Sequence, residues 1–255
     1  MKRLITALVL IPLVAWSILA APDWAFQLIL AVVGGLAYYE FDNIVAASGG
    51  LRAGWMGIGC GVAILQFPNA FLTVMIVCLL AMTQALRVRD MNQWLPAASR
   101  FVLGVVYIFG AWRCAVMLRA VNPHWLMFAM LLSWAGDTFA FYIGKPLGKH
   151  KLAPVVSPGK SWEGSAGSVA GAMLVGGLYA HWLIPEALLY QILLLAIAGN
   201  IAGQLGDLCE SAFKRGAGVK DSGTLLPGHG GWLDRIDSSL FSVPVVYALL
   251  TLFLR

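Results

Sequence analysis

The chain has 255 residues, of which 60% are hydrophobic and only 11% are charged. Together with a mean hydropathy of +0.81, this composition excludes an ordinary soluble globular protein and indicates an integral membrane protein. The formal net charge of +5 suggests a basic membrane face that suits anionic lipids or nucleotides, and we expect no binding to nucleic acid.

Nine apolar segments are candidates for membrane-spanning helices, since about 20 residues cross the hydrocarbon core. They cover residues 4–21, 24–40, 53–67, 70–86, 101–118, 125–144, 164–184, 187–211 and 238–254. Several are short, so eight or ten crossings also fit the sequence. No clear small-residue cleavage site follows the first segment, so we expect a helix there and not a signal peptide. The sequence predicts an all-α, polytopic membrane protein, a single domain over residues 1–255 with about nine transmembrane helices.

Lysine and arginine positions predict the orientation of these helices. With the N-terminus in the cytoplasm, fourteen of the 17 cations fall on the cytoplasmic side, as the positive-inside rule requires. Only Arg119 and Arg255 fall on the opposite side, and Arg113 lies within a span. The two longest polar loops, 145–163 and 212–237, are both cytoplasmic in this arrangement.

Residues 1–120 contain ordinary spans with short connections. Gly57 and Gly61 are four residues apart, a spacing that lets membrane helices pack closely. The cysteines of the whole chain lie in apolar stretches without a C-x-x-C pair, which argues against zinc, iron–sulfur and disulfide frameworks: Cys60, Cys78, Cys114 and Cys209. We expect residues 125–255, with their two cytoplasmic loops, to form the catalytic half.

An aspartate interrupts the apolar span at 125–144. Ser133 and Asp137 are four residues apart and share one helix face. A carboxylate at this depth costs about 2.5–3.5 kcal/mol on insertion scales unless it meets a cation. Asp137 could form an interhelical pair with Arg113, or it could line an ion or substrate site.

The loop at 145–163 is expected to be structured but not helical, because Pro154 and Pro158 block a continuous helix. Lys160, Ser161 and the free N–H groups before the next helix could bind a phosphate group. A second interpretation is a solvated basic patch beside the lipid, formed by Lys145, Lys149 and Lys151.

A polar stripe follows the helix expected at 187–211, at spacings of three and four residues: Asn200, Gln204, Asp207, Glu210, Ser211 and Lys214. Such a stripe can hold neighbouring membrane helices together. Two carboxylates three residues apart, Asp207 and Glu210, instead favour a bound cation.

The most polar part of the chain is residues 207–237, which contain five of its twelve acidic residues. Asp234 and Asp237 lie at the start of the last helix, after a glycine-rich turn that contains His229. Oxygen ligands in a phosphate setting suit Mg²⁺, which usually takes one or two carboxylates together with waters and substrate phosphates. His229 is equally compatible with a structural and a catalytic role.

Residues 211–237 carry the pattern S-x-F-K-R-x4-K-D-x-G-x2-L-P-x-H-G-G-x2-D-R-I-D. This pattern resembles the signature of the phosphatidate cytidylyltransferases, also called CDP-diacylglycerol synthases. The runs around Asp137 and residues 157–164 resemble other motifs of that family. Three positions depart from it: Trp232 replaces an aliphatic residue, Tyr142 follows Ala140 one residue late, and Ser161 replaces threonine.

The resemblance implies that CTP and phosphatidate react, with Mg²⁺, to CDP-diacylglycerol and pyrophosphate. The expected catalytic residues are Asp207, Lys220, Asp221, Asp234, Arg235 and Asp237. The expected Mg²⁺ ligands are Asp207, Asp221 and Asp237, with Asp234, Glu210 or Asp137 as further ligands of it or of a second cation. The substrates would be held by Ser157, Lys160, Ser161, Lys214, Arg215 and His229.

The expected partners are therefore CTP, phosphatidate and membrane lipids, in a bacterial inner membrane with the active site on its cytoplasmic side. Gly167 and Gly171 could pack helices within one chain or between the chains of a homodimer. The alternatives are a CTP-dependent lipid kinase or a CDP-lipid synthase for another lipid. A cation transporter is disfavoured, because transporters usually show two matching halves.

Overall fold

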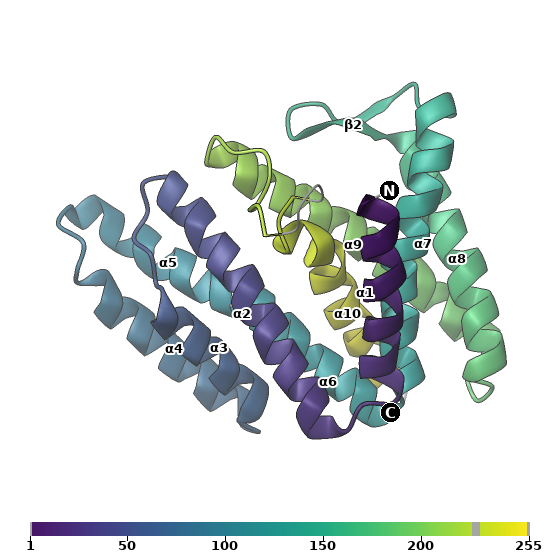
Figure 1. Cartoon of the computed structure of the whole chain (residues 1–255), viewed down its shortest axis with the longest axis horizontal. Helices are drawn as coiled ribbons and strands as arrows, with labels where there is room; N and C mark the ends of the chain where they lie inside the picture. The colour runs from purple at the N-terminus through teal and green to yellow at the C-terminus, as the bar shows by residue number, and fades with distance from the viewer. Residues whose placement is uncertain (1, 226–229, 254–255) are drawn as a thin grey trace. The chain divides into compact units, whose positions relative to one another are not determined.

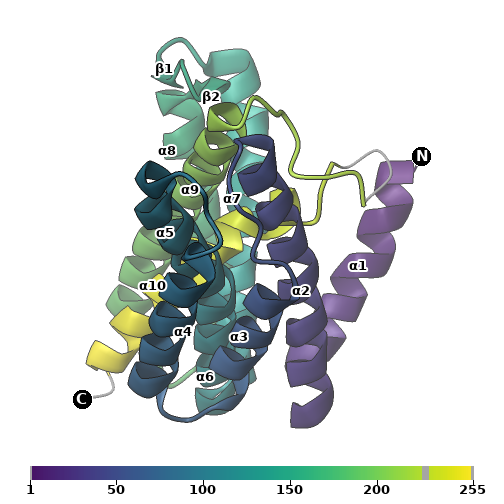
Figure 2. The same ribbon diagram turned by 90° about the vertical axis from the view of Figure 1, so that its left-hand side faces the viewer.

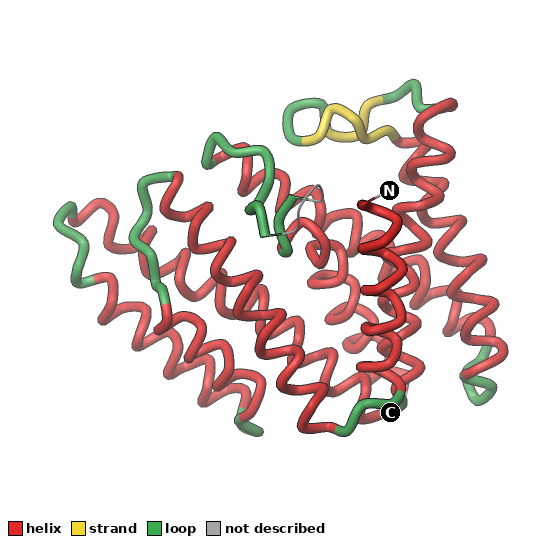
Figure 3. The backbone as a smooth tube through the Cα atoms, viewed as in Figure 1, coloured by secondary structure: helices red, strands yellow, loops and turns green. Residues whose placement is uncertain are grey.

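The computed structural model describes residues 2–225 and 230–253 (Figure 1). It is helical except for connections and one short hairpin (Figure 3). The elements are α1 Lys2–Leu19, α2 Asp23–Ala47, α3 Trp55–Gln66, α4 Ala70–Ala85, η1 Met91–Gln93, α5 Trp94–Val105, η2 Val106–Gly110, α6 Ala111–Val121, α7 Pro123–Leu147, β1 Lys151–Ala153, β2 Ser157–Ser161, α8 Trp162–Leu183, α9 Leu189–Gly216 and α10 Leu233–Phe253.

Each predicted span corresponds to a helix, and η1, α5, η2 and α6 form one continuous stretch. Within the described residues, five helices are long and apolar enough to cross a membrane: Asp23–Ala47, Met91–Val121, Pro123–Leu147, Leu189–Gly216 and Leu233–Phe253. Three apolar helices are shorter: Leu10–Leu19, Trp55–Gln66 and Ala70–Ala85. The glycine-rich α8 belongs to neither group. The structure thus supports an all-α integral membrane protein, while nine crossings stay a prediction.

The chain forms two compact units, each built from segments that are distant in the sequence. Unit 1 contains residues 1–8, 22–113 and 213–235. Unit 2 contains residues 9–21, 114–212 and 236–255.

Close helix packing at glycines organises unit 1, where α2 and α3 run side by side (Figure 2). A Cβ atom at Gly57 would collide with the ring of Tyr38 from α2, and one at Gly61 would collide with Phe109 from η2. The packing role predicted for these two glycines is therefore confirmed. Phe213 packs edge-on against Tyr107, with ring centroids 6.1 Å apart, and this contact attaches the end of α9 to η2.

A carboxylate fixes the connection between α2 and α3 in unit 1. Asp42 is buried, and its two oxygens accept the backbone N–H groups of Ala53 and Gly54, each at 2.9 Å. The backbone of this connection is thereby held on α2.

In unit 2, glycines let α8 lie directly against α7. A Cβ atom at Gly167 would come within 2.7 Å of Ile143, and one at Gly171 would collide with Phe139. Gly167 and Gly171 thus pack two helices of the same chain, which is the first of the two interpretations that the sequence allows. Gly206 plays a similar part on α9, since a Cβ atom there would lie 2.7 Å from the carbonyl oxygen of Asp237.

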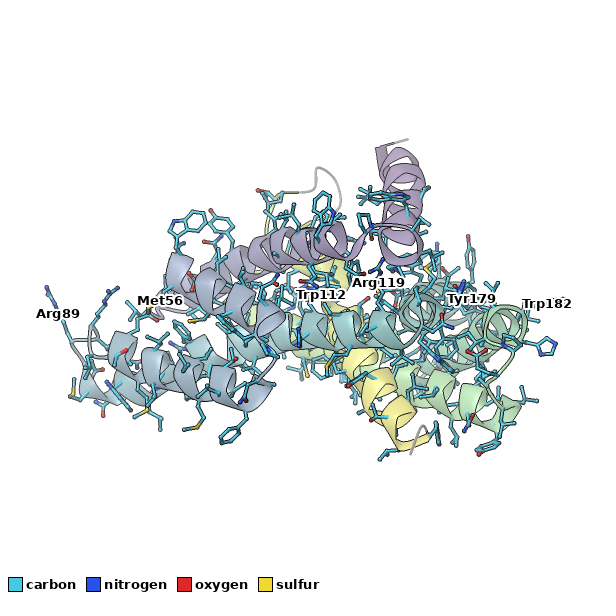
Figure 4. All side chains as sticks on the ribbon, turned by 90° about the horizontal axis from the view of Figure 1, so that it is seen from below. Met56, Arg89, Trp112, Arg119, Tyr179 and Trp182 are labelled. Carbon is cyan, nitrogen blue, oxygen red and sulfur yellow. The ribbon has the colours of Figure 1, made fainter. Side chains whose placement is uncertain are left out.

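Arg119, predicted to lie on the side opposite most cations, has a structural contact in unit 2 (Figure 4). Its Nε donates to the carbonyl oxygen of Ile18 at 2.8 Å, and a second guanidinium nitrogen donates to Ala21. The cation therefore satisfies carbonyl groups left open where α1 ends.

The loop expected at 145–163 contains a β-hairpin, which proline positions alone do not predict. Strands β1 and β2 are antiparallel, with Lys151 opposite Ser161. The backbone N–H of Lys149 and the ring of His150 bond to the carboxylate of Glu163, at 3.1 and 2.6 Å. The His150 hydrogen bond, followed by backbone N–H groups, lowers the pKa of Glu163 to about 2, so this carboxylate is ionised at neutral pH.

Candidate active site

Unit 2 contains a cavity of about 350 Å³ bounded by α7, the hairpin, α8 and α9. Its apolar lining includes Phe141 and Leu152. Its polar lining comprises Asp137, Lys145, Lys160, Ser161, Ser165, Ser168, Gln204 and Asp207. The structure therefore brings together predicted site residues from three separate motifs.

An ion pair joins two of these motifs. The Nζ atom of Lys160, on β2, lies 2.7 Å from Oδ2 of Asp207, on α9, and both side chains are partly exposed. Exposed pairs contribute only about 0–1 kcal/mol to stability, so a competing phosphate or cation could open this one at little cost. The pair is suited to binding chemistry more than to holding the fold.

A hydrogen-bonded network orders the cavity wall next to Asp207. Ser165 Oγ donates to Gln204 Oε1 at 2.5 Å, and Gln204 Nε2 donates to Asn200 Oδ1 at 2.8 Å. Asn200 Nδ2 continues the network to Ser168 Oγ at 3.0 Å. A Cβ atom at Gly136 would collide with Asn200, so this glycine makes room for the network. The polar stripe on α9 thus holds helices together at one end and lines the cavity at Asp207.

Ser161 has a structural contact at the edge of the cavity. Its Oγ accepts the N–H of Gly164 at 3.1 Å and caps the N-terminus of α8. Ser157 lies on the same strand but is not among the residues that line the cavity. Of the predicted phosphate-binding residues in this loop, Lys160 and Ser161 therefore reach the cavity.

A second polar cluster lies in unit 1, around Asp234. The Nζ atom of Lys214 is 2.5 Å from Asp234 Oδ1, and both side chains are nearly buried. Asp234 Oδ2 accepts the backbone N–H groups of Ser222 and Gly231, at 3.1 and 2.7 Å. Both oxygens of Asp234 are therefore engaged in organising the loop between α9 and α10.

Glu40, on α2 in unit 1, also contacts this loop and is not part of the sequence motif. Its side chain is only 1% exposed, and Oε2 accepts the Ser222 hydroxyl and the Leu233 N–H, both at 2.8 Å. Glu40 lies 182 residues before Ser222, so no local spacing connects them. The available signal was a carboxylate within an apolar helix, where a charge is rare and usually functional.

The other predicted site residues between positions 207 and 237 differ in their exposure to solvent. Lys220, Asp221, Arg215 and Arg235 are exposed, and Glu210 and Asp237 are buried. The guanidinium of Arg215 donates to the carbonyl oxygen of Val219 at 3.2 Å. Asp237 accepts the N–H of Ser238 at 2.7 Å. His229 lies outside the described residues.

The predicted Mg²⁺ ligands are divided between the units. Asp207 and Asp237 belong to unit 2, whereas Asp221 and Asp234 belong to unit 1. Within residues 2–225 and 230–253, no three His, Cys, Asp or Glu side chains form a group that could hold a metal. Asp137 and Asp207 nevertheless line one cavity with the amide of Gln204, and such oxygen donors fit Mg²⁺ completed by waters and phosphates.

Apolar helices around a cavity define an integral membrane protein, and the carboxylates and lysines of the cavity are chemically suited to bind cations and anions. The model of the Cytidylyltransferase family matches residues 1–253, and the chain belongs to this family.

Several curated relatives carry the same name. The phosphatidate cytidylyltransferase of Staphylococcus aureus (strain COL) is 41% identical over 162 residues, 60% of this chain and 59% of the relative. That of Staphylococcus saprophyticus is 40% identical over 153 residues, with the same coverage. The match thus spans about three-fifths of the length of these staphylococcal relatives. The phosphatidate cytidylyltransferase of Pseudomonas aeruginosa (strain PAO1) is 35% identical over 265 residues, 98% of this chain and 96% of the relative.

Proposed function

We propose that this protein is a phosphatidate cytidylyltransferase, which forms CDP-diacylglycerol and pyrophosphate from CTP and phosphatidate. The observation that carries the proposal is the unit 2 cavity, in which the carboxylates of Asp137 and Asp207 lie with the ammonium groups of Lys145 and Lys160. The name shared by the three relatives above supports it, particularly the relative that aligns along nearly the whole chain.

In this reaction, an oxygen of the lipid phosphate attacks the α-phosphorus of CTP in line, and the bond to pyrophosphate breaks. Both reactants are anions, so Lys145 and Lys160 offset their repulsion and hold the phosphate groups in place. No general base is required, because the lipid phosphate is already ionised. This reaction agrees with a cavity whose lining carries carboxylates and ammonium groups.

We assign the Mg²⁺ of this reaction to oxygen donors of the same cavity. Asp137 and Asp207 would hold it, and when bound it neutralises phosphate charge and orients the phosphate oxygens. The network from Ser165 through Gln204 to Asn200 keeps the wall beside Asp207 rigid. Asp221 and Asp237 stay predicted ligands, and Glu210 or Asp234 stay candidates for a second cation.

We further propose that the protein crosses a bacterial inner membrane nine times, with its N-terminus and its active site on the cytoplasmic side. The one-to-one match between predicted spans and helices supports the count. The excess of lysine and arginine in alternate loops supports the orientation. A homodimer would need a surface other than Gly167 and Gly171, because these residues pack against α7.

The proposal is tested with detergent-purified protein, labelled CTP, phosphatidate and Mg²⁺, with and without EDTA. We expect EDTA-sensitive release of pyrophosphate together with a CDP-lipid. Formation of CDP and a phosphorylated lipid from a lipid alcohol would instead show a kinase. A panel of acidic lipids would identify a synthase for a different lipid, and no turnover with any of them would contradict an enzymatic role.

A further inference from the structure

Glu40 is a buried carboxylate on α2 whose hydrogen bonds reach only the loop between α9 and α10 among the described residues. Oε2 accepts a bond from the hydroxyl of Ser222 and one from the N–H of Leu233, both at 2.8 Å. Ser222 follows Asp221, a predicted metal ligand, and Leu233 is the first residue of α10. One oxygen atom therefore holds Ser222, inside the loop, and the first residue of α10 at the same point on α2.

Ser222 connects Glu40 to Asp234, and Asp234 in turn connects to Lys214. The Ser222 hydroxyl accepts the N–H of Asp234 at 3.3 Å, and the Ser222 N–H donates to Asp234 Oδ2 at 3.1 Å. Asp234 Oδ1 in turn holds the ammonium group of Lys214 at 2.5 Å. A change at Glu40 would thus affect Ser222, then Asp234 and then Lys214, because hydrogen bonds connect these residues in that order.

The loop backbone lies so close to Glu40 that only glycine fits. A Cβ atom at Gly223 would collide with Oε1 of Glu40. A Cβ atom at Gly231 would collide with Oε2 and with the Ser222 hydroxyl. Both glycines belong to the motif at 211–237, and their proximity to the carboxylate gives a physical reason for their presence.

Burying a carboxylate within an apolar helix costs free energy. We therefore expect Glu40 to make interactions that an apolar residue could not make. Asp42 offers a direct comparison, because it lies two residues further along α2 and is also buried. Its oxygens hold Ala53 and Gly54, which no motif includes. The two acids are therefore both buried on the same helix but hold different segments.

We propose that Glu40 is a positioning residue of the cytidylyltransferase reaction, which acts as a hydrogen-bond acceptor for Ser222 and Leu233. By fixing Ser222 through its hydroxyl, Glu40 sets the place of the neighbouring Asp221 and, through Asp234, the direction of Lys214. Its effect on turnover rests on the proposed function, whereas its effect on the loop backbone does not.

The experiment compares Glu40→Ala and Glu40→Gln with the matched controls Asp42→Ala and Asp42→Asn in full-length, detergent-purified protein. Three quantities are measured: hydrogen exchange of peptides that contain Ser222 and Leu233, the thermal midpoint, and kcat with KM for each substrate. We expect Glu40→Ala to speed exchange at Ser222 and Leu233 and to lower kcat by about 10- to 100-fold, the range found for residues that orient metal ligands.

The conservative variant separates positioning from mere stability. The amide oxygen of Glu40→Gln can still accept both bonds, so we expect it to retain much more of kcat than Glu40→Ala. Asp42→Ala should speed exchange near Ala53 and leave kcat per folded molecule unchanged. Equal kcat in the Glu40 and Asp42 alanine variants, or a Gln variant no better than Ala, would overturn the proposal.

Two further outcomes keep the proposals distinct. If the wild-type protein does not convert the substrates, the proposed function is wrong. The loop contact is tested separately: unchanged hydrogen exchange at Ser222 in Glu40→Ala would overturn it. If Glu40→Ala does not fold, Ser222→Ala replaces it, since that change removes one bond to Glu40 and one to Asp234. Wild-type exchange and kcat in folded Ser222→Ala would then overturn the positioning role.

Discussion

Asp207 is the residue at which the polar stripe of α9 changes from hydrogen bonds between helices to an ion pair in the cavity. Asn200 and Gln204 are hydrogen-bonded within the protein, whereas Asp207 faces the cavity and holds Lys160 across it. A carboxylate and an ammonium group that are paired but partly exposed can exchange partners when a phosphate and a cation arrive.

Asp207→Asn is expected to lower kcat by at least about 100-fold, because a neutral amide is a poor ligand for Mg²⁺. The thermal midpoint should shift little, since a partly exposed ion pair contributes only about 0–1 kcal/mol. Turnover is measured in the pyrophosphate assay, with Glu186→Gln as a control at an exposed acid of the same unit. Activity close to that of the control would remove Asp207 from the site.

Lys160→Ala is expected to raise KM for one substrate with a smaller change in kcat, because Lys160 binds a phosphate in both the ground state and the transition state. Initial rates are measured over a range of CTP at saturating phosphatidate, and the reverse. Lys149→Ala serves as the control, since that lysine is exposed and outside the cavity lining. An unchanged KM for both substrates would mean that the hairpin lysines form only a surface patch.

The residues of the cavity could largely be predicted, because charges in an apolar chain are rare and fall into recognisable motifs. The sequence predicts Asp137, Lys160 and Asp207 as site residues, and all three line the cavity. Glu40 and Ser222 could not be connected, since their contact depends on how α2 meets a loop far away in the sequence. Glu40 also accepts the N–H of Leu233, the first residue of α10, five residues before the span predicted from hydropathy.

At the scale of elements, the helices were predictable because long apolar runs are ended by glycine, proline and polar residues. The hairpin at 151–161 was not, because its short strands carry no alternating apolar pattern. The sequence identifies glycines of α8 as a packing surface, but only the structure shows which helix packs against them. That helix is α7, whose bulky side chains occupy the space above Gly167, Gly171 and Gly176.

Gly171→Ala is expected to destabilise unit 2 by about 1–3 kcal/mol, the usual cost of overpacking, because the added methyl group would collide with Phe139. Gly177→Ala is the matched control on the same helix, since no atom lies within 4 Å of a Cβ atom there. Thermal unfolding in detergent compares the two variants. A midpoint for Gly171→Ala equal to or above that of Gly177→Ala would contradict the close packing of α7 and α8.

At the scale of the whole molecule, the arrangement in the membrane determines which solution the site can reach. CTP is a cytoplasmic nucleotide, so a site for it must open on that side of the membrane. The hairpin and the loop between α9 and α10 carry most of the predicted substrate-binding residues. In the proposed arrangement of nine crossings, each of them follows an even-numbered crossing and is expected on the cytoplasmic side. The connection between α8 and α9 should then lie on the other side.

Single cysteines test this arrangement in a variant whose four natural cysteines are replaced by alanine. In intact cells, a membrane-impermeant thiol reagent should label Glu186→Cys, between α8 and α9, because that connection faces away from the cytoplasm. Lys149→Cys, before the hairpin, should react only after the membrane is opened. Both positions are exposed, so access to the reagent depends on the side of the membrane and not on burial. Labelling of both in intact cells would mean that α8 does not cross the membrane, and the count of nine crossings would be wrong.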